Sequence, residues 1–374
     1  MNAHYPDFLG ETAKRIGLRR YPEVRQFVVQ HLYADTLRLL LLLHRHVPID
    51  VVIGIGYSGQ DTVVQQLREA GIRVVTPSYE ALRQTVADEL GASLARCRDS
   101  GRELLIHEVG GYAIRALHEA FADDIDLVAG AVEITKQGVW VAESLPELRI
   151  PQLNCAQTRL KEIEGRMVGD AVAASIDTVL RELGLSLSGR RATLLGYGWV
   201  GSGCARGLSA RGMQVSVHDS DDIRQVAAAV DGHVLTTPTV SEPAPFLVLG
   251  ASGHCSIDRE CLQSLPDGCF IASGASKDHE IDLDSLRDGS ERMESIHPHV
   301  DACHMRDGRC LYLINQGFPV NFIASSVPDE IVEFLFAELI MLVPELLDKR
   351  PSPGIWPLSE ERERLAARIW LQLR

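Results

Sequence analysis

RRATLLGYGWVGSGCARGLSARGMQVSVHD, residues 190–219, decides the fold of this chain. A short apolar run of strand length leads into Gly196, Gly198 and Gly201, which have the spacing G-x-G-x-x-G. A helical segment and a second apolar run follow, and the second run ends at Asp219. This order is typical of a βαβ unit that binds a dinucleotide.

Each residue type in this pattern has a physical task. The first glycine makes the tight turn, the second lets a pyrophosphate approach the backbone, and the third lets helix and strand pack closely. The helix N-terminus offers free N–H groups to the phosphates. Asp219 lies where an acid accepts a hydrogen bond from a ribose 2′-hydroxyl and repels a 2′-phosphate. The stretch therefore predicts NAD rather than NADP; a glycine turn without a ligand is the less favoured alternative.

The composition indicates a soluble globular protein large enough for two domains. The chain has 374 residues, of which 45% are hydrophobic and 24% charged. Its net charge of −14 argues against nucleic acid or an anionic membrane as the partner. There is no signal-peptide pattern, no apolar run long enough to span a bilayer, and no C-x-x-C among the eight cysteines. We expect a cytoplasmic protein with reduced thiols that acts on a small molecule.

Hydrophobic periodicity divides the remaining sequence into elements. Residues 1–47 are predicted to be helical, and Pro48 ends the last helix. A second strand–helix–strand unit follows, with Gly54, Gly56 and Gly59 at its first turn. Its second strand ends without an acid, so we expect no dinucleotide there. Further alternation of strands and helices predicts mostly parallel sheets.

These elements predict an α/β fold with two Rossmann-like domains, each a mostly parallel, doubly wound sheet, and a cleft between them. A substrate domain would comprise residues 1–158, completed by C-terminal helices within 323–374. Residues 159–322 would form the NAD-binding domain. The apolar face of a predicted helix at 329–347, together with the tail, indicates a homo-oligomer, either a dimer or a tetramer.

Four blocks resemble the S-adenosylhomocysteine hydrolase (adenosylhomocysteinase) family. They are GYGWVGSGCA (196–205), HDSDDIRQVAAAVDGH (218–233), SKDHEIDLDSL (276–286) and VDACHMRDGRCLYLINQGFPVNF (300–322). Their order and spacing match the family's NAD-binding domain, and ITKQGV (134–139) resembles its threonine-rich, cofactor-contacting loop. The family uses tightly bound NAD internally: it oxidises a ribose 3′-hydroxyl, eliminates homocysteine, adds water and reduces again.

The resemblance implies a set of cofactor contacts. Those at the pyrophosphate would be Gly196, Gly198, Trp199, Val200 and Gly201. Asp219 would hold the adenosine ribose. The nicotinamide side would be lined by Thr135, Gln137, Gly274 and Asn321.

The family's catalytic positions carry other residue types in this chain. Positions that the family fills with lysine, aspartate, asparagine, histidine and threonine are occupied here by Arg159, Ile163, Glu164, Ser276, Pro328, Tyr112, Tyr57 and Gly59. The family's lysine- and tyrosine-bearing tail has no counterpart in ERERLAARIWLQLR (361–374). An arginine cannot be deprotonated as a tuned lysine can. We therefore favour an NAD-dependent oxidoreductase acting on a small polar or nucleoside-like alcohol or ketone. The alternatives are a divergent hydrolase of a thioether nucleoside and an inactive NAD-binding regulatory protein.

The candidates for catalysis each have a structural alternative. Lys161 lies two residues after Arg159 and is the candidate general base, although a solvated helix lysine is more common. Glu164 is a base or a partner of Arg159, or a surface carboxylate. Glu108 ends a predicted strand, where α/β proteins bind ligands, and Tyr112 opens the next helix.

Other chemically active residues are weaker candidates. His107 also ends that strand, and Tyr57 is a hydrogen-bond donor in the first glycine turn, although packing roles are about as common. Cys155 lacks a recognisable histidine partner, so a buried thiol is favoured. The group His297, His299, Cys303 and His304 fits no zinc template, and no metal is predicted.

Overall fold

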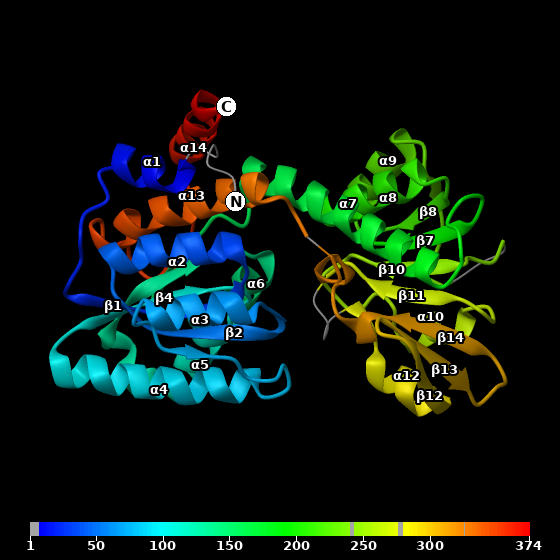
Figure 1. Ribbon diagram of the computed structural model, residues 1–374, viewed down its shortest axis with the longest axis horizontal. Helices are drawn as coiled ribbons and strands as arrows, with labels where there is room; N and C mark the ends of the chain where they lie inside the picture. The colour runs from blue at the N-terminus through cyan, green and yellow to red at the C-terminus, as the bar shows by residue number, and fades with distance from the viewer. Residues whose placement is uncertain (1–6, 240–242, 276–279, 325) are drawn as a thin grey trace. The chain divides into compact units, whose positions relative to one another are not determined.

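The computed structural model describes residues 7–239, 243–275, 280–324 and 326–374. The chain forms two compact α/β units, each with its own sheet (Figure 1). Unit 1 comprises Met1–Lys161 and Asp329–Arg374, and unit 2 comprises Glu162–Pro328. The predicted α/β class with two mostly parallel sheets is confirmed.

Unit 1 contains a seven-stranded sheet and most of the helices. Its strands are β1 (Val24–Leu32), β2 (Ile49–Gly59), β3 (Val74–Val75), β4 (Glu103–Glu108), β5 (Val128–Glu133), β6 (Pro151–Asn154) and β15 (Gly354–Pro357). Its helices are α1 (Phe8–Arg15), α2 (Ala34–His46), α3 (Asp61–Glu69), α4 (Leu82–Ser100), α5 (Tyr112–Ala120), α6 (Lys136–Ser144), α13 (Asp329–Leu347) and α14 (Glu360–Leu373), with a short 3₁₀ helix η1 (Ala122–Leu127).

Unit 2 contains the eight-stranded sheet. Its strands are β7 (Arg191–Leu195), β8 (Gln214–His218), β9 (Val234–Leu235), β10 (Leu247–Gly250), β11 (Phe270–Ser273), β12 (Ser290–His297), β13 (Val300–Met305) and β14 (Cys310–Ile314). Its helices are most of α7 (Arg159–Glu182), α8 (Trp199–Ala210), α9 (Asp222–Val230), α10 (Arg259–Ser264) and α12 (Leu283–Gly289), with 3₁₀ turns η2 (Asn315–Gly317) and η3 (Val320–Phe322).

The sheet of unit 1 has the order β15-β6-β5-β4-β1-β2-β3, and its strand pairs are parallel. The chain moves outward from β1 to β2 and β3, then returns to place β4 on the other side of β1. Ligands of open α/β sheets bind at such a reversal, beside the carboxyl ends of the strands. The candidate ligand edge of unit 1 is therefore where β1 and β4 end.

The prediction of helix throughout residues 1–47 was wrong, because β1 occupies 24–32. Most of β1 is buried, and a strand that is covered on both faces has a continuous apolar run rather than an alternating one. Such a run cannot be distinguished from a buried helix by periodicity alone. The C-terminal tail also contains a strand, β15, which pairs with β6 at the sheet edge.

Helices cover both faces of this sheet. Figure 1 shows α2 and α13 over one face and α4 and α5 against the other. The most deeply buried of them is α13, which packs against β5, β6 and α2. Within the described residues, no helix is both long and apolar enough to cross a membrane.

The sheet of unit 2 has the order β12-β13-β14-β11-β10-β7-β8-β9. Six neighbouring strands of this sheet are parallel: β9, β8, β7, β10, β11 and β14. Strand β13 is antiparallel to both of its neighbours, β12 and β14. The sheet reverses between β7 and β10, so the glycine turn after β7 lies at the reversal point.

Glycines bring α7 and α8 into very close contact. A Cβ on Gly169 would lie 2.2 Å from the carbonyl oxygen of Val200, and one on Gly203 would lie 2.2 Å from that of Arg166. Real Cβ atoms do not approach backbone atoms so closely. The backbone contact fixes α8, and with it the turn that precedes the helix.

Candidate functional site

The glycine turn of unit 2 has the geometry that its spacing predicts. Gly196 has a φ of 101°, and a Cβ there would lie 2.6 Å from the carbonyl carbon of Ala251. A Cβ on Gly201 would lie 2.1 Å from the carbonyl oxygen of Gly196. No side chain caps the N-terminus of α8, which begins at Trp199 after Gly198. The turn and helix end therefore form a backbone cradle suited to a pyrophosphate.

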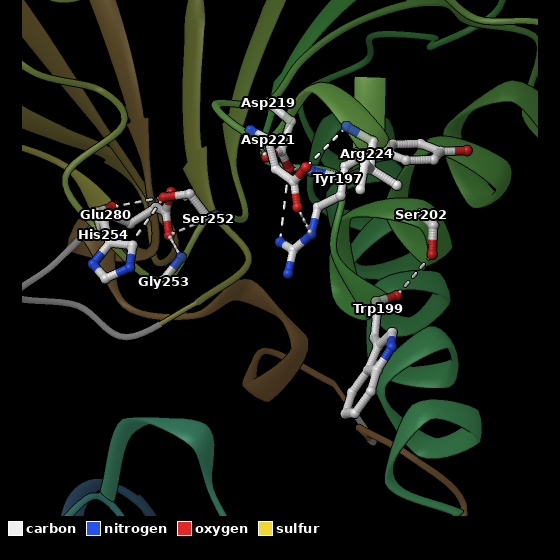
Figure 2. A network of polar contacts seen from close by, with 11 residues as sticks. Tyr197, Trp199, Ser202, Asp219, Asp221, Arg224, Ser252, Gly253, His254 and Glu280 are labelled. Carbon is white, nitrogen blue, oxygen red and sulfur yellow. Dashed lines mark hydrogen bonds and ion pairs between the residues drawn. The ribbon is translucent and has the colours of Figure 1, made fainter. Parts of the chain in front are cut away.

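Asp219 follows β8 and is held beside this cradle. Its side chain is 5% exposed, and its two oxygens accept hydrogen bonds from the N–H of Tyr197 at 2.5 Å and of Asp221 at 2.9 Å. Arg224 Nη1 lies 3.8 Å from Asp219 Oδ2 (Figure 2). A carboxylate oxygen accepts more than one hydrogen bond, so Asp219 retains acceptor capacity for a ribose diol.

A second buried acid, Glu280, organises the loop that follows β10. Glu280 is fully buried and accepts from the N–H of Ser252 at 3.0 Å, the N–H of Gly253 at 2.9 Å and the Ser252 hydroxyl at 2.8 Å. Figure 2 shows these contacts on the other side of the sheet reversal from Asp219. Glu280 lies within SKDHEIDLDSL (276–286), and no role for it was predicted from the sequence. Its partners are 24 to 28 residues away in the chain, so no local pattern reveals them.

The other residues assigned to the cofactor in unit 2 lie on elements near the reversal. Trp199 and Val200 form the first turn of α8 and are partly buried. Gly274 follows β11, and its N–H donates to the Gly250 carbonyl at 2.8 Å. Asn321 is 4% exposed and donates to Ser326, while its Oδ1 has no partner among the described residues. A hydrogen-bond donor on a ligand would satisfy that oxygen. Ser276 lies outside the described residues.

A pair of buried carboxylates marks the carboxyl edge of the sheet in unit 1. Glu108 and Glu133 are fully buried and are register partners at the ends of β4 and β5. They therefore face the same side of the sheet. Glu108 accepts from the N–H of Ala113 at 2.6 Å and of Ile114 at 3.0 Å, at the start of α5.

Glu133 fastens the two loops that follow β4 and β5. Its donors, at 2.8 to 3.3 Å, are the N–H groups of Gly110, Gly111, Ile134 and Thr135 and the hydroxyl of Thr135. Gly138 lies directly against it, since a Cβ there would lie 1.7 Å from Glu133 Oε2. Position 138, the glycine of ITKQGV, must therefore be glycine, because any side chain there would collide with the Glu133 carboxylate.

Unit 1 is expected to lose stability as the pH rises from about 5 to about 8. Burial and then the Glu133 carboxylate raise the pKa of Glu108 to about 8, and burial raises the pKa of Glu133 to about 7. Both values exceed those of the unfolded chain, so the folded state binds more protons in this window and the unfolding free energy falls with rising pH. Urea unfolding at several pH values measures the slope. Glu108→Gln stays neutral and should flatten it; an unchanged slope in this variant would contradict the assignment.

The residues assigned to the nicotinamide side from unit 1, and Tyr112, lie on these same loops. Thr135 caps α6: its hydroxyl oxygen accepts from the N–H of Gly138 at 3.1 Å and of Gly110 at 3.1 Å. Gln137 is in the first turn of α6, and Tyr112 begins α5. Thr135 thus has a structural task in unit 1 in addition to the cofactor contact that the resemblance implies.

His31, which the sequence analysis missed, lies at the end of β1. Its Nδ1 is hydrogen-bonded to the Ser58 hydroxyl at the end of β2, and its ring packs against that of Tyr57 at 5.8 Å. Burial, and then the charge of Lys161, lowers the pKa of His31 to about 4, so the ring is neutral at pH 7. Tyr57 and Gly59, which the resemblance places at catalytic positions of the family, lie at the end of β2. His31 and Leu32 are the last residues of β1, and Tyr33 connects β1 to α2.

Lys161 and Arg159 begin α7 beside this edge. The Lys161 N–H donates to the Thr158 hydroxyl at 3.1 Å, and that hydroxyl donates to Glu338 Oε2 at 3.0 Å. Arg159 is exposed, and its N–H donates to Glu363 at 2.6 Å. Burial raises the pKa of Glu338 to about 8. The structure thus brings Lys161 near His31 and Glu338 at one edge of unit 1.

Glu164, His107 and Cys155 are buried. Glu164 is 8% exposed and belongs to unit 2. His107 faces the opposite side of the sheet from Glu108, and neither ring nitrogen has a partner among the described residues. Burial lowers its pKa to about 4 and raises that of the Cys155 thiol well above its usual value. Within the described ranges, no group of three or more side chains suits a metal ion.

Comparison with known proteins agrees with the resemblance seen in the sequence. Residues 171–327 match the family model described as "S-adenosyl-L-homocysteine hydrolase, NAD binding domain". The adenosylhomocysteinase of Thermotoga maritima is 26% identical over 91% of this chain and 85% of its own length. The S-inosyl-L-homocysteine hydrolase of Methanothermobacter thermautotrophicus is 24% identical over 76% of this chain and 69% of its own. The predicted resemblance is confirmed, and the predicted cofactor, NAD, is the one that the matching family model names.

The fold also has a solved counterpart. A putative D-3-phosphoglycerate dehydrogenase from Ralstonia solanacearum aligns over 91% of this chain and 97% of its own, with a TM-score of 0.51 and 13% identity. At that identity the likeness concerns the fold alone.

Proposed function

We propose that this protein is an NAD-dependent oxidoreductase on an adenosylhomocysteinase-like scaffold, which transfers hydride to or from a small polar or nucleoside-like alcohol or ketone. The observation that carries the proposal is the glycine turn of unit 2 with Asp219 fixed beside it by two N–H groups. The glycines leave a cradle that any side chain would fill. When bound, NAD supplies a hydride donor and acceptor.

The chain's own residues have separate tasks in this proposal. The N-terminus of α8 binds the pyrophosphate, Asp219 binds the adenosine ribose, and Asn321 Oδ1 accepts a hydrogen bond on the nicotinamide side. The substrate is assigned to unit 1. There Lys161 Nζ removes or returns the proton of the substrate hydroxyl, and neutral His31 orients that hydroxyl. We also propose a cytoplasmic homo-oligomer, as the sequence predicts.

A divergent thioether-nucleoside hydrolase is the second candidate. Two observations favour it: the curated hydrolases align over most of the chain, and His31 lies at the end of the first strand. Such a reaction needs further acid–base groups. The positions that the resemblance matches to the family's histidines hold Ser276 and Pro328, which cannot serve as such groups.

One experiment separates the candidates. One portion of the purified full chain is denatured to identify bound nucleotide by mass spectrometry. A second, native portion is incubated with NAD and either nucleosides and polyols or S-adenosylhomocysteine. Formation of NADH with an alcohol supports the oxidoreductase, and Lys161→Met should lower its rate by about 10²- to 10⁴-fold with unchanged NAD affinity. Release of the homocysteine thiol would instead favour the hydrolase. Tight NAD binding without any turnover would favour the third alternative, an inactive NAD-binding regulatory protein.

A further inference from the structure

Glu338 is a buried carboxyl group with few hydrogen-bond donors around it. It lies on α13 and is fully buried. Its Oε2 is 3.0 Å from the hydroxyl oxygen of Thr158, and its Oε1 has no hydrogen-bond partner among the described residues. Glu133, which is equally buried, has five donors for its two oxygens. Because burying a charge is costly unless hydrogen bonds compensate it, these surroundings suit a neutral Glu338 better than an ionised one.

The Thr158 hydroxyl has one hydrogen and two acceptors within reach. The carbonyl oxygen of Cys155 is 3.1 Å away, and Glu338 Oε2 is 3.0 Å away. The other donor to that carbonyl among the described residues is the Thr158 N–H, at 3.5 Å. The hydroxyl oxygen also accepts from the Lys161 N–H at 3.1 Å. Because a hydroxyl donates only once, an ionised Glu338 would take its hydrogen and leave the Cys155 carbonyl poorly satisfied.

A proton on Glu338 satisfies all of these contacts at once. A protonated carboxyl group donates one hydrogen bond, so Glu338 can donate to Thr158 while Thr158 donates to the Cys155 carbonyl. The hydroxyl then uses its one hydrogen and accepts twice, from Glu338 and from the Lys161 N–H. The unpartnered Oε1 becomes an uncharged oxygen, which is much less costly to bury. In agreement with this count of donors, burial raises the pKa of Glu338 to about 8.

Two charged side chains act on Glu338 from other helices. After burial and the Thr158 contact, Glu363 raises and Lys161 lowers the pKa of Glu338. Glu363 lies on α14, which packs against α13 (Figure 1). Lys161 lies on α7, and after burial its charge also lowers the pKa of His31. Lys161 is thus the cation that links Glu338 to the candidate site of unit 1.

The other elements packed against α13 are α1, α2, β5 and β6. Charged side chains on the two helices pair with other acids: Arg15 with Glu11, and Arg38 with Glu333. The sheet contributes the Cys155 thiol, whose pKa is raised well above its usual value by burial and then by Glu338. Glu133, at the end of β5, acts on that thiol in turn. The titration of Glu338 therefore depends mainly on its burial, Thr158, Glu363 and Lys161.

We propose that Glu338 is a positioning residue for Lys161: it holds a proton at neutral pH, and it becomes the counter-ion of the Lys161 ammonium group when it loses that proton. The inference rests on the proposed function, in which Lys161 takes the proton of the substrate hydroxyl. A neutral Glu338 does not favour the ammonium form of Lys161, whereas an ionised Glu338 does. An ammonium group has no lone pair to accept a proton, so the ionisation of Glu338 opposes the reaction. The released proton goes to the solvent, and the Thr158 hydroxyl turns from the Cys155 carbonyl to Glu338.

Infrared difference spectroscopy of the full chain measures the proton on Glu338 without any substrate. The wild-type spectrum minus that of Glu338→Gln, both at about pH 6, should contain the carbonyl band of one protonated acid. The band should disappear as the pH rises, with a midpoint near pH 8. Glu338→Gln should fold, because its amide can donate to Thr158 as the acid does. A difference spectrum without this band at about pH 6 would overturn the proposal.

The same band tests the coupling to Lys161. Lys161→Met should move the midpoint upward by about 0.5 to 1 pH unit, because the cation that stabilises the carboxylate is lost. Arg159→Met is the matched control: Arg159 lies two residues earlier on α7, is exposed, and acts on Glu360. It should leave the midpoint in place. Equal midpoints in the wild type and Lys161→Met would show that Glu338 has no link to Lys161.

Oxidation of an alcohol by NAD tests the effect on the reaction. The kcat of the wild type should fall about tenfold between about pH 8 and about pH 10, whereas that of Glu338→Gln should not fall, with KM unchanged in both. Identical pH profiles of kcat would overturn the positioning role. If no alcohol yields NADH, the oxidoreductase proposal fails, and the infrared band still decides whether Glu338 holds a proton and responds to Lys161.

Discussion

Replacing Asp219 with alanine is expected to weaken NAD binding about 100-fold, or about 2.7 kcal/mol. The carboxylate is held next to the glycine turn by the N–H groups of Tyr197 and Asp221, so it needs no reorganisation to accept from a ribose diol. Hydrogen bonds to a charged acceptor contribute about 1.5–3 kcal/mol each. Isothermal titration calorimetry with NAD measures the loss.

Two further variants make this test specific. Asp231→Ala removes the acceptor of the Tyr197 hydroxyl, 2.7 Å away, but leaves the turn intact, so NAD affinity should be unchanged. Asp219→Ser should raise the affinity for NADP relative to NAD, because Arg224 then faces a 2′-phosphate without the opposing carboxylate. Unchanged NAD affinity in Asp219→Ala would show that the cofactor binds elsewhere.

The parts of the fold that the sequence predicts are those built from neighbouring residues. The glycine turn, α8, β8 and Asp219 occur within one stretch, so their order along the chain is their order in space. α13 has the predicted limits, since it shows a helical repeat between clear breaks. The residues within each of these stretches are sufficient to predict its structure.

The missed features depend on contacts between distant residues. β1 is a strand because β2 and β4 pair with it on both sides, and its own apolar run fits a helix equally well. Misplacing β1 also hid His31, which becomes a candidate site residue only when Ser58 of β2 lies beside it. Glu280 shows the same limit, since its role depends on a loop more than 20 residues earlier.

The pairing of Glu108 with Glu133 was equally invisible in the sequence. Glu108 was predicted because it ends a strand, but Glu133 was assigned no role. The parallel register of β4 and β5 places the two side by side, and the turn of Gly110-Gly111 then brings two N–H groups to Glu133. This carboxylate therefore fixes both loops that carry the predicted residues of unit 1.

Replacing Glu133 with alanine is accordingly expected to lower the free energy of unfolding by about 3–5 kcal/mol, the usual cost of breaking a buried charged network. The change removes an acceptor from four N–H groups, those of Gly110, Gly111, Ile134 and Thr135, of which only that of Gly110 keeps a second acceptor, the Thr135 hydroxyl. A loss of this size is a large fraction of the total stability of a typical domain. Urea unfolding followed by circular dichroism measures it.

The size of the effect in related variants identifies its cause. Glu133→Gln keeps one acceptor oxygen, and four of the five donors converge on Oε1, so it should lose only about 1–2 kcal/mol. Glu143→Ala, at an exposed position of α6, should stay within about 0.5 kcal/mol of the wild type. If glutamine were as damaging as alanine, the negative charge of Glu133, rather than its acceptor geometry, would hold the loops. In that case the neighbouring Glu108 would have to carry the proton of the pair, and Glu108→Gln would leave the stability of the protein unchanged at neutral pH.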